Sequence, residues 1–137
     1  FLLVFLMAQK RLLSNSYNVL SMTTSYTIDA KDKSLGRLAS EVAALLNAKN
    51  SIDFVKNRVA DVSVKVINAS QVKVTGNKMK VSVHKSFSGY PSGLKEMPLD
   101  YVVANKGFGE LIKHAVLGML PKNKLQDIRM KNLVIEE

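Results

Sequence analysis

The sequence of 137 residues contains no cysteine, no tryptophan and only two histidines. Without cysteine the chain can form no disulfide framework, zinc ribbon, iron–sulfur site or thiol-based active site. His84 and His114 are far apart in the sequence, so a metal site would need the fold to gather both with carboxylates. We therefore expect neither a metal nor a cofactor. Any base stacking is left to Tyr, Phe or Arg.

Acidic residues are missing from residues 1–28, where the apolar run FLLVFLMA precedes Lys10 and Arg11. This run is too short to span a bilayer, which takes about 20 residues. A secretory signal has its charges before the apolar run, not after it. We interpret residues 1–21 as a leader outside the working domain. It is either a transit peptide or upstream sequence translated in frame before Met22, with a structured extension as the third alternative. Residues 22–137 are expected to form one domain.

Basic residues outnumber acidic ones by 20 to 11, which gives a net charge of +9. Hydrophobic residues make up 47% of the chain, enough for one buried core and too many for disorder over the whole length. The charge excess points to an anionic partner, with nucleic acid ahead of a membrane surface. A basic enzyme or a merely solvated basic surface is the alternative.

Hydrophobic periodicity predicts alternating strands and helices from Tyr26 onward. The valines at 62, 64 and 66 belong to a strand expected to be buried on both faces. Ser34 stands at a helix N-cap position, and Pro121 ends a helix. Predicted strands lie at 26–28, 62–67, 71–74, 80–83 and 133–135, and predicted helices at 35–46, 98–104 and 108–119. This order of elements is typical of α/β or α+β proteins.

The sequence has no convincing catalytic motif. Gly107-Phe-Gly109 lacks the third glycine of a dinucleotide fingerprint and is better explained as a flexible entry into a helix. Asp29 and Asp32 are expected to be solvated turn carboxylates, and no nucleophile elbow is present. Gly118 is expected at a close backbone approach, where a valine would overpack the core.

Two basic stretches lie beside turns and favour RNA binding over a solvated face. Residues 71–95 carry five lysines and no acidic residue, with Phe87 and Tyr90 near a Gly/Ser/Pro loop. Residues 122–131 carry four basic residues and one acidic residue, Asp127. Lysines, hydroxyls and backbone amides on loops suit contacts with phosphates and 2′-hydroxyls.

Several motifs resemble the family of large-subunit ribosomal protein thirteen. They are LGRLAS at 35–40, VINA at 66–69, VTGNK at 74–78, SGYPSGLK at 88–95 and AVLGMLPKNKL at 115–125. The resemblance covers residues 26–135 and implies a single α/β domain, with three α/β/α layers around a small, mainly parallel sheet. The family tends to continue with Leu-Gly-Arg where this chain has Leu125, Gln126 and Asp127, so Arg129 is a candidate substitute for the arginine.

The resemblance also implies a function without catalysis. The chain would be a structural constituent of the large ribosomal subunit that binds 23S-type rRNA, supports subunit assembly and touches neighbouring ribosomal proteins. It implies neither a membrane nor a small-molecule substrate. The location would be the cytoplasmic ribosome of a bacterium, or alternatively a mitochondrial or plastid ribosome. The rival function is a regulatory RNA-binding protein acting off the ribosome.

The residues expected to contact RNA lie on the basic stretches or at the start of the first helix. There the N–H groups and the Arg37 guanidinium could share one phosphate. Pairing with Glu41 is the alternative for Arg37. Tyr90 would either stack on an unpaired base or pack on Pro91. The full set is Arg37, Lys73, Thr75, Asn77, Lys78, Lys80, Lys85, Ser88, Tyr90, Lys95, Lys122, Asn123, Lys124, Arg129 and Lys131.

Overall fold

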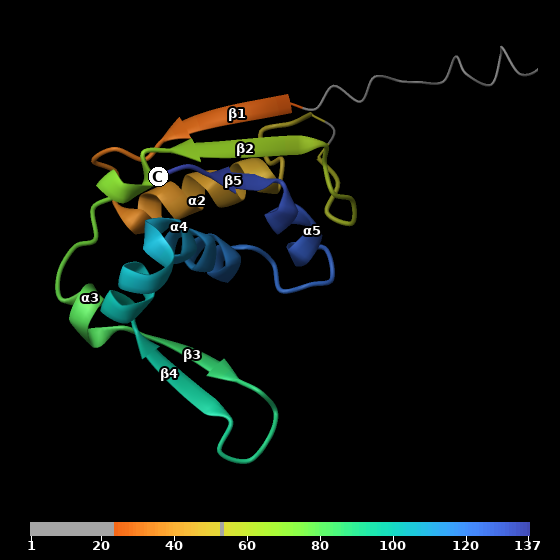
Figure 1. The fold of residues 1–137 in the computed structure, drawn as a ribbon. Coiled ribbons are helices and arrows are strands. Elements are labelled where there is room, and N and C mark those ends of the chain that lie inside the picture. Colours follow the sequence, from red (N-terminus) through yellow and green to blue (C-terminus); the bar gives the residue numbers. More distant parts are fainter. Residues whose placement is uncertain (1–23, 53) are drawn as a thin grey trace, which may run out of the picture.

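The computed structural model describes residues 24–52 and 54–137, and the leader expected at 1–21 lies outside them. Its elements follow one another as strands and helices in the α/β manner (Figure 1). In chain order they are β1 (Thr24–Asp29), α2 (Leu35–Leu46), β2 (Val62–Ile67), the 3₁₀ turn η1 (Ala69–Gln71), α3 (Lys78–Val81), β3 (Val83–Phe87), β4 (Leu94–Pro98), α4 (Leu99–Met119), α5 (Gln126–Lys131) and β5 (Leu133–Ile135).

A three-stranded parallel sheet with the strand order β1-β2-β5 forms one side of the core. Val62, Val64 and Val66 of β2 are buried, because alternate residues of a strand point to the same face. On the opposite face Lys65 and Val134 are exposed, and Ser63 and Ile67 are only half-buried. The expected burial of β2 on both faces is therefore wrong. The α/β class and the small, mainly parallel sheet are confirmed, and the described helices cover one face of this sheet.

Helices α2 and α4 pack on the valine face and complete the core. The apolar residues of α2 recur at helical spacing, which places Leu38 and Val42 on one buried stripe. Ile112 and Val116 of α4 belong to the same cluster, and all four side chains are fully buried. Ser34 is the N-cap residue of α2 as predicted, but its side chain makes no capping hydrogen bond. The first turn of α2 therefore keeps unused polar groups.

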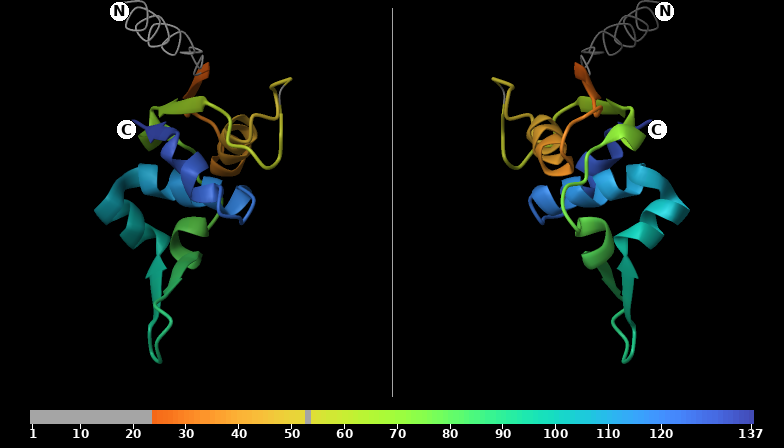
Figure 2. Two further views of the ribbon diagram at one scale, coloured as in Figure 1. Left: turned by 90° about the vertical axis from the view of Figure 1, so that its right-hand side faces the viewer. Right: turned by 90° about the vertical axis from the view of Figure 1, so that its left-hand side faces the viewer.

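A hairpin of β3 and β4 projects away from the sheet, at the opposite end of the molecule (Figures 1 and 2). The strand predicted at 71–74 is wrong: η1 and an isolated bridge between Ser34 and Lys73 stand there. The strand predicted at 80–83 begins only at Val83, because α3 takes the preceding residues. Runs as short as these are ambiguous, and their neighbours decide the conformation.

Helix α4 contains a sharp kink at Gly107. Its φ of 77° and ψ of 176° are not helical, so the two helices predicted at 98–104 and 108–119 meet end to end at this residue. Positive φ costs glycine little, because it has no Cβ. The interpretation of the Gly107–Gly109 motif as a flexible helix entry is thus confirmed. Glu137 lies beside this entry, where its Oε1 accepts a hydrogen bond of 3.3 Å from the N–H of Gly109.

Replacing Gly118 with alanine should raise the free energy of unfolding by about 0.5–1 kcal/mol. The close approach expected at Gly118 is wrong, since a Cβ built there would meet nothing within 4 Å. The residue lies in the regular second half of α4, where glycine only adds conformational entropy to the unfolded chain. Urea melts of the two proteins measure the change. A lower midpoint for the variant would contradict the expectation.

Candidate nucleic-acid interface

The first turn of α2 and the segment 73–78 enclose a basic hollow on the surface. Its volume is about 440 Å³, and its polar lining includes Ser34, Arg37, Thr75 and Lys78. Backbone hydrogen bonds hold the two segments side by side: the N–H of Leu35 donates to the carbonyl of Lys73 at 3.1 Å. The hollow follows the carboxyl ends of β1 and β2, where ligands of parallel α/β sheets commonly bind. We call it the α2 hollow.

Backbone donors at the start of α2 are available to a ligand. The N–H groups of Leu35 and Leu38 donate to protein carbonyls, whereas those of Gly36 and Arg37 have no acceptor among the described residues. No acidic side chain occupies the first turn. A Cβ at Gly36 would have open space around it, so the backbone can be approached closely. Unpaired N–H groups and the helix dipole make such a turn favourable for an anion.

Among the described residues Arg37 and Lys78 have no ion-pair partner, unlike Lys33 and Lys73. Lys33 pairs with Glu41 at 2.8 Å, and Lys73 pairs with Asp32 at 2.8 Å. The alternative partner of Arg37, Glu41, is thus engaged by another cation. The hydrogen bond and charge of Lys73 hold the pKa of Asp32 below its usual value, so this carboxylate stays ionised at neutral pH.

Asn77 and Lys80 lie next to the α2 hollow, on and before the short helix α3. The carbonyl of Asn77 accepts the N–H groups of Lys80 and Val81, while its side chain makes no capping bond. Both side chains are exposed. The structure therefore brings three predicted residues of the stretch that begins at residue 71 to the α2 hollow with Arg37, namely Lys73, Thr75 and Lys78. Asn77 and Lys80 do not line the hollow and are its neighbours in the chain only.

The predicted residues of the hairpin form a second, separate group. Ser88, Tyr90 and Lys95 are exposed around its tip, and Lys85 pairs with Glu96 across the strands at 2.9 Å. Tyr90 keeps 75% of its surface exposed, so its ring is largely available to a partner. The hairpin lies well away from the sheet in Figure 1, and this group does not join the α2 hollow.

A third group lies between α4 and α5. Lys122, Asn123 and Lys124 are exposed in this loop, and Asn123 Oδ1 accepts the N–H of Leu125 at 3.1 Å. Lys131 is exposed at the end of α5. Arg129 differs from the expectation, because only 3% of it is exposed.

The Arg129 guanidinium points inward, not toward a solvent-side ligand. Its Nη2 donates to the carbonyls of Lys56 and Arg58 at 3.4 and 3.5 Å. Nε and Nη1 are buried and have no hydrogen-bond partner among the described residues. The side chain is on the inner face of α5, a position that composition alone does not reveal. The predicted RNA contact of Arg129 is therefore not available in this structure.

Sequence reasoning did not include Ser34 and Gly36 in the candidate site, although both line the α2 hollow. The sequence did carry a signal for them, since a capping residue, a glycine and an arginine occur at the start of a predicted helix.

His84 and His114 stack with ring centroids 3.7 Å apart, and burial together with the charge of His114 lowers the pKa of His84. Within residues 24–52 and 54–137, no cluster of side chains is suited to hold a metal ion, and no helix could cross a membrane.

Comparisons with known proteins agree on one family. The model of the family described as "Ribosomal protein L13" matches residues 23–135. A similar protein is "Large ribosomal subunit protein uL13" of Chlamydia muridarum, 43% identical over 108 residues that cover 79% of this chain and 71% of that protein. The protein of the same name from Thermus thermophilus is 41% identical over 108 residues, covering 79% and 76%.

Proposed function

Since the chain belongs to the ribosomal protein L13 family, we propose that it is a structural constituent of the large ribosomal subunit that binds rRNA through phosphates. The observation that carries this proposal is the α2 hollow. There, within the part of the chain that the structure describes, the N–H groups of Gly36 and Arg37 have no acceptor, and the cationic side chains of Arg37 and Lys78 in the same hollow have no ion-pair partner. This combination of donors and charge suits a phosphate group.

A phosphate in the α2 hollow would be held by several kinds of donor. The planar guanidinium of Arg37 can bind two phosphate oxygens at once, whereas the ammonium of Lys78 acts as a point charge. The hydroxyls of Ser34 and Thr75 line the same hollow and add neutral hydrogen bonds. None of these contacts reads a base, so they position the protein on RNA without sequence preference.

The three basic groups would bind separate parts of the RNA. In Figure 1 the start of α2 and α3 lie at the left, the loop between α4 and α5 lies at the right, and the hairpin extends below both. A rigid domain that contacts phosphates at three separate places stabilises RNA folds in which the contacted RNA segments lie close together. This supports a part in assembly of the subunit. The curated relatives named above are bacterial, which favours a bacterial ribosome as the location.

Replacing Arg37 and Lys78 together with alanine should weaken binding to a large-subunit rRNA fragment by at least about a hundredfold, because each of the two lost charge-assisted hydrogen bonds contributes about 1.5–3 kcal/mol. The slope of log affinity against log salt should fall by about one for each lost phosphate contact. Filter binding at several salt concentrations measures both quantities.

The matched control removes two exposed lysines of α4, Lys106 and Lys113, which also lowers the charge by two. These lysines lie outside the three basic groups, so the control should change the affinity much less. Equal losses of rRNA affinity in both double variants would mean that the α2 hollow contributes only general positive charge and is not a specific phosphate site.

Co-sedimentation of the chain with large subunits through a high-salt wash separates a ribosomal constituent from a regulatory protein acting off the ribosome.

A further inference from the structure

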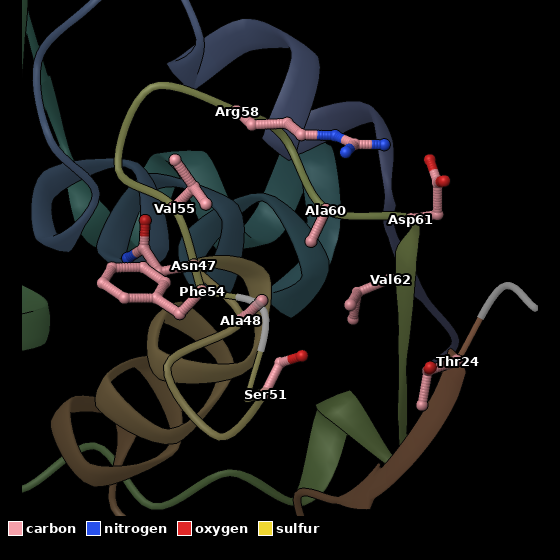
Figure 3. Close-up of a pocket in the computed structure, with 10 residues that line it drawn as sticks. All are labelled: Thr24, Asn47, Ala48, Ser51, Phe54, Val55, Arg58, Ala60, Asp61 and Val62. Carbon is pink, nitrogen blue, oxygen red and sulfur yellow. The ribbon is translucent and has the colours of Figure 1, made fainter. Parts of the chain in front are cut away.

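Two further features of the structure lie outside the three basic groups. One is a cavity of about 540 Å³ at the other end of α2 (Figure 3). Its Asp61 carboxylate and Phe54 ring lie at opposite ends of the cavity, so these side chains do not converge on one ligand. The other is the stack of His84 on His114, which is a direct contact between strand β3 and helix α4.

The hairpin of β3 and β4 is attached to the rest of the domain by one face. Within these two strands only His84 and Met97 are half-buried, and every other residue is exposed. His84 and Met97 pair directly across the strands, so their side chains lie on the same face. No residue of either strand belongs to the main core cluster. Beyond its root, the hairpin is therefore oriented by what this one face contacts.

The partner of the His84 ring is the ring of His114. The ring centroids are 3.7 Å apart, and the ring planes differ by 23°. His114 follows the kink at Gly107 and lies in the half of α4 that packs on the sheet, next to Ala115 and Val116. Among the described residues, no hydrogen bond or ion pair links the hairpin with this half of the helix. The stack is the specific contact that ties the hairpin to the body of the domain.

The charge of this pair changes close to neutral pH, as histidine does more readily than other side chains. Burial lowers the pKa of His84, the charges of His114 and Lys106 lower it further, and Glu110 acts in the opposite direction. Met97, the cross-strand neighbour of His84, carries no charge. Two protonated rings at this separation repel each other. Because folding lowers the pKa of His84, the stack is most stable above the usual pKa of histidine and weakens as the pH falls below it.

We propose that the His84–His114 stack is a proton-sensitive joint, which holds the hairpin in one direction while the pair is neutral and releases it when both rings are charged. The two histidines act as positioning residues for the hairpin tip, where Tyr90 and Lys95 are exposed. This consequence rests on the proposed RNA-binding function, because a tip with a fixed direction can meet RNA without first being ordered. The joint itself is a property of the free protein and can be tested without RNA.

The test is a distance measurement between two spin labels on the full chain, which has no cysteine of its own to take up a label. Ser92→Cys places one label at the exposed hairpin tip, and Ser70→Cys places the other on the exposed turn η1 after β2. The distance distribution should be narrow at about pH 7.5 and should broaden at about pH 5, as the pair becomes charged.

Three variants at neighbouring positions identify the cause of that broadening. His114→Phe keeps an aromatic ring that takes up no proton, so its distribution should be narrow at both pH values. His114→Ala removes the stack and should give a broad distribution at both. Lys113→Ala, a change at the exposed neighbouring position, should behave as the original chain does. An equally narrow distribution for His114→Ala, or the same broadening on acidification for His114→Phe, would overturn the proposal.

Binding to the rRNA fragment provides a second readout at neutral pH. His114→Ala should weaken this binding by about 2–10-fold, as expected for the loss of one aromatic pair that orients the hairpin. His114→Phe should bind as the original chain does. An unchanged affinity of His114→Ala together with a broadened distance distribution would support the joint and contradict the hairpin contacts of the proposed function.

Discussion

Binding of the chain to a large-subunit rRNA fragment should weaken by about 10³–10⁵-fold between about 50 and 200 mM salt, if about 6–10 phosphates are neutralised. This number of contacts is consistent with the exposed cations of the three basic groups. Each neutralised phosphate releases condensed counterions, and added salt opposes that release. Affinities measured across a salt series give the number of contacts directly from the slope.

An uncharged co-solute supplies the control for this measurement. Urea at low concentration, or sucrose, alters the solvent without changing the ionic strength, and the affinity for RNA should then stay near its starting value. An affinity for RNA that does not depend on salt would refute the electrostatic mechanism, even if the chain sediments with ribosomal subunits.

Replacing Ile112 with alanine should lower the free energy of unfolding by about 2–5 kcal/mol. The side chain is 0% exposed and lies where α4 meets α2 and the sheet. Its removal loses buried apolar surface and leaves a cavity that the parallel sheet and two helices cannot easily close. Chemical denaturation monitored by circular dichroism gives the difference.

Leu117→Ala is the matched control on the same helix, because Leu117 is 37% exposed and outside the core cluster. Its cost should stay near the small values typical of surface positions, about 0.5 kcal/mol. Per folded molecule, the Ile112 variant should keep its affinity for rRNA, since the residue does not line the α2 hollow. A similar cost for both variants would mean that α4 contributes little to the core.

Long periodic segments made most of the fold predictable from the sequence. The predicted helix 35–46 coincides with α2, and the predicted strands 62–67 and 133–135 coincide with β2 and β5. The errors fall on short segments. Strand β4 has a glutamate and a proline within five residues, and α5 has only six residues. Pairing with β3 and packing near β5 determine these elements, and neither partner is visible in a local pattern.

The candidate site was predictable in its members but not in its grouping. Arg37 and Lys78 were identified from charge and helix position, yet only the bridge between Ser34 and Lys73 explains why they lie around one hollow. Arg129 illustrates the opposite case. A basic residue in a basic stretch is usually exposed, but this one is on the inner face of a short helix. The sequence does not show which face of such a helix turns inward.

The parallel pairing of β5 with β2 has a consequence for the order of synthesis. A growing chain makes the segments of the α2 hollow first, since β1, α2, β2 and residues 73–78 all precede the hairpin and α4. The buried contact of Leu133 with the sheet arrives only when nearly all the described residues have been translated. During that interval one edge of β2 stays unpaired, and such edges are prone to incorrect association. A nascent chain would therefore present the segments of the α2 hollow before its sheet is closed, and early capture by RNA, if the hollow binds phosphate as proposed, would shorten the time that β2 spends exposed.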